Sequence, residues 1–137
     1  MTTVNELLAK LGFTTDEIET LHKEHPDLKH VLAVDVLQIL KYLEKQGLKV
    51  IEIINMALAN PWVLVESFER IDYLEKYYKM IGIEGEMYKE LLIKWPISIS
   101  LNPIHVKQEI ERQREIGRND IQIREDFFAN FDKYFSI

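Results

Sequence analysis

The chain has 137 residues, and its 17 Lys and Arg against 23 Asp and Glu give a formal net charge of −6. The length fits one domain, and 47% hydrophobic with 29% charged residues is typical of a globular protein, not of a disordered or fibrous one. The lack of Cys excludes disulfides, a thiolate nucleophile and Cys-containing zinc sites. The negative charge argues against a generic polycationic binder of nucleic acids or membranes, although it is compatible with a local basic stripe.

No segment approaches the roughly 20 consecutive apolar residues that a membrane-spanning helix needs. The first residues, from Met1 to Leu8, match neither a signal peptide, with its basic start and apolar core, nor an Arg-rich transit peptide. We therefore expect no membrane partner, and these features leave the compartment open.

Breaker residues recur along the chain with one period. Four of the five glycines are spaced by 35 residues, at Gly12, Gly47, Gly82 and Gly117. Three of the four prolines keep the same spacing and each follows its glycine by 14 residues, at Pro26, Pro61 and Pro96. Two kinds of breaker with one period indicate an internal repeat, with units starting at 12, 47 and 82 and a partial unit at 117.

Residues 1–11 are predicted to be the last helix of an incomplete preceding repeat. Val4 and Leu8 have the phases that Ile39 and Leu43 have one repeat later. The chain is therefore expected to begin with half a unit.

Residues 12–46 form the first complete unit. Thr14 followed by Glu17 predicts a capping box at the start of a helix, and Pro26 is expected to end that helix. The apolar spacing from Val36 to Leu43 predicts a second helix, which closes on the next glycine in a left-handed turn.

The units 47–81 and 82–116 repeat this order, and Pro103 is predicted to be the first residue of a helix. Residues 117–137 form a final half-unit. The sequence thus predicts an all-α fold: one domain over residues 1–137, a short α-solenoid of about three helix pairs with half-repeats at both ends.

The order Leu-Gly-apolar, helix, Pro-x-x-apolar, helix resembles the repeat of the mitochondrial transcription termination factor (mTERF) family. The second unit shows it best, in Gly47-Leu48, Ile53-Ile54, Asn60-Pro61-Trp62-Val63-Leu64, Ser67-Phe68, Ile71 and Leu74. A Gly-to-Pro offset of 14 residues fits neither tetratricopeptide nor pentatricopeptide repeats. The resemblance implies a mitochondrial, non-enzymatic regulator of gene expression that binds nucleic acid through a basic surface.

Lys and Arg gather near the ends of the predicted second helices, and we call this set the basic ladder. Its members are Lys10, Lys41, Lys45, Lys76, Lys79, Arg112 and Arg114. The last six are the candidate phosphate contacts. The alternative is that these cations only complement helix dipoles and are neutralised by acids across the glycine turns, such as Glu17, Glu52 and Asp120.

Aromatic residues provide two further hypotheses. Tyr73, Tyr77 and Tyr78 are candidates for stacking on bases, with Tyr77 expected to be exposed. The C-terminal half-unit contains Phe128, Phe131, Tyr134 and Phe135, which either fold back onto the third unit or expose a patch for a protein partner or a second copy. The alternative function is therefore an acidic protein-interaction module that binds a helix or peptide through its concave face or this helix.

Catalytic and metal-binding signals are weak. His22 and His25 share a predicted helix face and His30 follows, but Pro26 breaks the helix before a third ligand can converge. No phosphate-binding loop, dinucleotide fingerprint or Gly-x-Ser-x-Gly motif is present. We expect no metal, no cofactor and no enzymatic activity.

Overall fold

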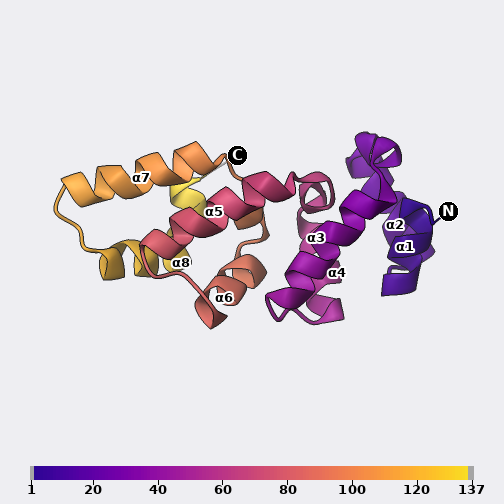
Figure 1. Cartoon of the computed structure of the whole chain (residues 1–137), viewed down its shortest axis with the longest axis horizontal. Helices are drawn as coiled ribbons and strands as arrows, with labels where there is room; N and C mark the ends of the chain where they lie inside the picture. The colour runs from indigo at the N-terminus through magenta and orange to yellow at the C-terminus, as the bar shows by residue number, and fades with distance from the viewer. Residues whose placement is uncertain (1, 136–137) are drawn as a thin grey trace. The chain divides into compact units, whose positions relative to one another are not determined.

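The computed structural model describes residues 2–135, and every regular element in this range is helical (Figure 1). The chain divides into two compact units, the first ending at Phe68 and the second starting at Glu69, and each is described by itself. The predicted all-α fold is confirmed.

The first unit contains one half-repeat, one complete repeat and the larger part of the next repeat. Its elements are α1 (Val4–Leu11), α2 (Thr15–Glu24), η1 (Pro26–His30), α3 (Ala33–Lys45), α4 (Val50–Ala59) and η2 (Pro61–Val65), where η marks a 3-10 helix. The order helix, Pro-led 3-10 bend, helix follows the repeat predicted from the sequence.

The second unit continues the same order. Its elements are α5 (Phe68–Met80, with Phe68 itself in the first unit), α6 (Glu86–Lys94), η3 (Pro96–Ile99), α7 (Pro103–Glu115) and α8 (Asp120–Tyr134). Pro103 is the first residue of α7, as predicted. That the repeats stack as a solenoid and form one domain stays a prediction.

Local sequence explains where the helices begin. The predicted capping box at α2 is present: the Thr14 hydroxyl accepts from the Glu17 amide at 3.1 Å, and the Glu17 carboxylate accepts from the Thr14 amide at 2.8 Å. Thr3 caps α1 by accepting from the Glu6 amide at 3.1 Å. These bonds satisfy amides that have no partner within the helix.

Breaker residues explain where the helices end. Gly12, Gly47, Gly82 and Gly117 all have positive φ, from 84° to 125°, a region that side chains disfavour. Each repeat proline is the first residue of a 3-10 bend, where its missing N–H removes no helical hydrogen bond. The 35-residue spacing of the breakers therefore sets the spacing of the helix pairs.

Each unit has an apolar core on the faces that the periodicity predicts. In the first unit Leu8, Val36 and Leu43 are fully buried, and in the second unit Ile71 and Leu74 are. None of the helices in the described part of the chain has the length and apolarity to cross a membrane.

Candidate nucleic-acid interface

The six predicted phosphate contacts lie on the last two turns of the second helix of each repeat. Lys41 and Lys45 are on α3, Lys76 and Lys79 on α5, and Arg112 and Arg114 on α7. All six side chains are exposed. A cation at the carboxyl end of a helix is favoured by the helix dipole, so this placement by itself is compatible with either hypothesis.

Three of the six are held by carboxylates of the second unit. The Lys76 ammonium lies 3.3 Å from Asp72, one turn earlier on α5. The Arg112 guanidinium forms two hydrogen bonds with Glu109, at 2.9 and 2.6 Å, and this pairing lowers the pKa of the Glu109 carboxyl.

Arg114 has the most partners of the set. It donates to both oxygens of Asp120, at 3.0 and 3.1 Å, and to the Met80 carbonyl at 3.1 Å. The last bond joins the carboxyl ends of α5 and α7. Arg114 therefore stabilises contacts within the second unit before it is available to any ligand.

The remaining cations of the basic ladder have no ion pair within the part of the chain that the structure describes. Among residues 2–135, no carboxylate pairs with Lys10, Lys41, Lys45 or Lys79. Lys10 lies in the last turn of α1 at the repeat position that Lys45 takes in α3, and α1 packs against α3. The unpaired lysines are thus concentrated in the first unit.

Two of the three acids named as expected to neutralise the basic ladder, Glu17 and Glu52, have other partners. Glu17 accepts from the amide of Thr14, and Glu52 accepts from the amide of Lys49 at 2.7 Å, so both carboxylates cap the helices they begin. Only Asp120 reaches across its glycine turn to a ladder cation, Arg114. Neutralisation across the turns is therefore local to the last repeat.

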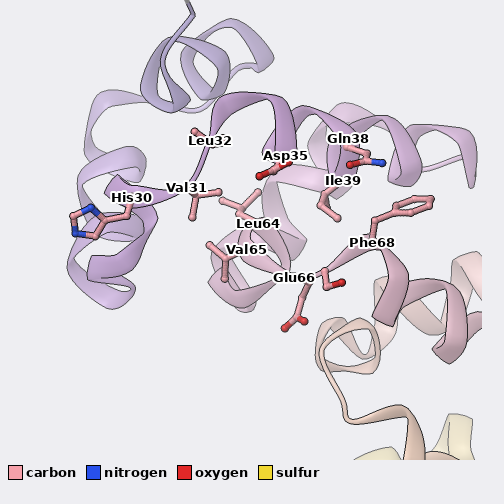
Figure 2. A pocket seen from close by; sticks show the side chains of 11 residues that line it. His30, Val31, Leu32, Asp35, Gln38, Ile39, Leu64, Val65, Glu66 and Phe68 are labelled. Carbon is pink, nitrogen blue, oxygen red and sulfur yellow. The ribbon is translucent and has the colours of Figure 1, made fainter.

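The opposite end of α3 has acidic surroundings. A hollow of about 470 Å³ lies between the start of α3 and η2, and Figure 2 shows Asp35 and Glu66 on its two sides, with Ile39 and Leu64 between them. The Asp35 carboxylate makes this hollow unfavourable for phosphate.

The aromatic residues of α8 are mostly part of the core. Phe131 and Phe135 are buried, their ring centroids are 4.7 Å apart, and Phe131 also stacks on Trp95 at 6.0 Å. Phe128 is half-buried, and its carbonyl accepts a hydrogen bond from the Trp95 indole at 2.8 Å. The rings fold back onto the third repeat, so Phe131 and Phe135 are not available as an exposed patch.

Tyr134 is half-buried and donates a hydrogen bond to Asp126. Asp126 was not among the candidate residues predicted from the sequence. Asp126 also accepts from Arg118 at 3.0 Å and from Asn130 at 2.9 Å. These three donors, with Tyr134 contributing most, lower the pKa of the Asp126 carboxyl to about 2.

The histidines lie in separate surroundings. His22 forms a 2.6 Å hydrogen bond with Asn5, while His25 is buried and its ring contacts Trp62 edge-on at 4.3 Å. Among the described residues no group of three His, Asp or Glu side chains is close enough to share a metal ion.

These features define an all-helical repeat protein built from 35-residue helix pairs with exposed cations at the ends of the second helices. The family model described as mTERF matches residues 6–122, and the chain belongs to the mTERF family. No curated protein and no solved structure matches the chain.

Proposed function

We propose that this protein is a non-enzymatic, nucleic-acid-binding regulator of gene expression that acts as a transcription termination factor does. The carrying observation is that Lys41, Lys45 and Lys79 are exposed and unpaired among residues 2–135, at the ends of the second helices where the repeat spacing predicts the basic ladder. Each can bind a phosphate without breaking an existing ion pair.

Lys76, Arg112 and Arg114 are the further phosphate contacts in this proposal, and they act more weakly. Each would have to leave or share a carboxylate, and the bidentate pairs of the two arginines are the more costly ones to give up. We therefore expect substitutions at the unpaired lysines to lower the affinity for nucleic acid more than substitutions at Lys76, Arg112 or Arg114.

The test compares two triple variants with equal charge change. In the first, Lys41, Lys45 and Lys79 become Gln; in the matched control, the exposed Lys23, Lys29 and Lys49 become Gln. Fluorescence anisotropy with labelled duplex and single-stranded oligonucleotides at low salt should show about ten-fold or greater loss for the first variant and little for the control. Equal losses would mean that only net charge matters, and no binding by the wild type would reject the proposal.

A second candidate function, self-association, is supported by an apolar hollow of about 600 Å³ between α1 and α3, lined by Thr2, Leu7, Lys10, Leu32, Ala33, Val34 and Leu37. Leu32 and Val34 are 64% and 67% exposed. In a two-fold pairing of two copies through this hollow, the same apolar residues of each copy would contact each other. Val34→Glu should then convert a dimer to a monomer in sedimentation velocity; a monomeric wild type contradicts the pairing.

A further inference from the structure

Two tyrosines and two lysines form an aromatic and basic surface on α5 and α7 of the second unit. The Lys76 ammonium lies 5.3 Å from the ring centre of Tyr73, and the Lys107 ammonium lies 6.0 Å from that of Tyr77. We call these four residues the tyrosine surface. Lys107 is not part of the basic ladder, so a count of charges by repeat position does not find it.

Comparison with the preceding repeat explains why this surface is open. Tyr42 has the repeat position of Tyr77, but Tyr42 is buried and Phe68 packs edge-on against it at 5.6 Å. One repeat after Phe68 the chain has Pro103, which offers no aromatic ring. Tyr77 is accordingly half-buried, and Tyr73 is 46% exposed one turn earlier on the same helix face.

We propose that the tyrosine surface binds single-stranded nucleic acid, with unpaired bases stacking on Tyr73 and Tyr77 while Lys76 and Lys107 contact the adjacent phosphates. This inference rests on the proposed function and specifies its substrate as a single strand. Duplex bases are already stacked on each other, so only a single strand can present base faces to exposed rings.

The spacing of the two rings suits successive or near-successive bases. Residues four apart on an α-helix rise about 6 Å along its axis, which leaves room for a base beside each ring. The lysines are paired only at exposed positions: Lys76 with Asp72 at 3.3 Å and Lys107 with Glu111 at 3.9 Å. Exposed pairs of this kind are weak, so phosphate can compete with them.

The buried tyrosine on the same helix provides a contrast. Tyr78 is fully buried and donates to the Ser98 carbonyl at 2.6 Å, and burial raises the pKa of its hydroxyl well above the usual value. Of the three tyrosines that the sequence suggested for stacking, Tyr78 is therefore a core residue. Tyr77, which was expected to be exposed, is half-buried, and Tyr73 is the exposed one.

The experiment measures binding of the full chain to a single strand of about 16 nucleotides, to the duplex of the same sequence, and to an abasic version of the strand. Tyr73→Leu/Tyr77→Leu removes both rings, and Tyr73→Phe/Tyr77→Phe retains them. We expect the wild type to prefer the single strand, the Leu variant to lose about ten-fold or more, and the Phe variant to bind like the wild type. The abasic strand should bind the wild type as weakly as the intact strand binds the Leu variant.

The outcomes separate the two proposals. The proposal that the tyrosine surface binds a single strand is overturned if the wild type prefers the duplex, or if the Leu variant and the wild type bind the single strand equally tightly. The proposed function stands in either case. If no nucleic acid binds at low salt, both are rejected. Should circular dichroism show that the Leu variant is unfolded, the abasic strand decides: equal binding of abasic and intact strands by the wild type would overturn the inference.

Discussion

At the scale of single residues, ion pairs with carboxylates of the same chain decide which Lys and Arg side chains can contact a phosphate. Lys76 and Arg112 pair with acids one turn earlier on the same helix, whereas the residue four positions before Lys45 is Lys41. Two like charges at this spacing repel each other and leave the pair open to a polyanion. We therefore expect the local sequence around each lysine to matter more for phosphate binding than the net charge of the chain.

Asp126 provides a prediction about pH. Its folded pKa of about 2 lies below the value of about 3.9 for an unfolded aspartate, so the carboxylate stabilises the folded chain. This stabilisation is complete above pH of about 4 and is lost as the pH falls toward 2. Asp126→Asn should lower the free energy of unfolding by about 1–3 kcal/mol at pH 7, and the difference from the wild type should shrink below pH 4.

The measurement for Asp126 is urea unfolding at a series of pH values. Asp132→Asn serves as the control, because Asp132 is exposed on the same helix. A difference between the wild type and Asp126→Asn that stays constant down to pH 2 would contradict the role of the ionised carboxylate.

At the scale of elements, α8 is held to the third repeat by a hydrogen bond and by aromatic packing. Trp95 donates to the Phe128 carbonyl and stacks on Phe131, which also contacts Phe127 edge-on at 6.1 Å. The hydrogen bond and these ring contacts together hold α8 against the residues around Trp95.

The second prediction concerns this attachment. Phe131→Ala should cost about 3–5 kcal/mol because it removes a fully buried ring, and Trp95→Phe should cost about 1 kcal/mol through the lost hydrogen bond. Ile121→Ala, at a 52% exposed position of α8, should change the free energy of unfolding by less than about 0.5 kcal/mol. Urea unfolding of the three variants checks this; a Phe131→Ala protein as stable as Ile121→Ala would place the ring outside the core.

Element boundaries could be predicted from the sequence because they depend on neighbouring residues. Pro26, Gly47 and the Thr14–Glu17 capping box act within a few residues, and all three are found as predicted. The family followed from the same spacing. The cation partners within one helix, such as Asp72 for Lys76, also follow a local rule of spacing.

The remaining features depend on contacts that the periodicity does not encode. The Asp126 cluster forms around a non-helical Asn130 inside α8, with φ of −138°, and brings in Arg118 from the preceding turn. The contact of Lys107 with Tyr77 depends on how α7 packs beside α5. Both require the tertiary arrangement, for which the repeat periodicity provides no direct signal.

At the scale of the whole molecule, the charge of −6 does not oppose phosphate binding uniformly. Asp35 and Glu66 surround the amino end of α3, whereas Lys41 and Lys45 occupy its carboxyl half. Electrostatic interactions are screened over about 10 Å at 0.1 M salt, so nearby charges dominate for a bound phosphate. An acidic protein can therefore bind a polyanion at one recurring position.

Whether residues 1–137 act as one domain is also a property of the whole chain. The second repeat spans the boundary between the two units, because η2 belongs to the first unit and nearly all of α5 to the second. A helix-pair repeat needs both helices to bury its apolar faces. We therefore propose that the two units fold as one domain.

The most direct test of phosphate binding through unpaired lysines is the salt dependence of nucleic-acid affinity. For the wild type, the logarithm of the association constant should fall with the logarithm of salt concentration with a slope of about −2 to −4, as a few phosphate contacts require. In the variant with Lys41, Lys45 and Lys79 changed to Gln, the slope should flatten to a value between about −1 and zero. A wild-type slope near zero, or an unchanged slope in the variant, would contradict the account.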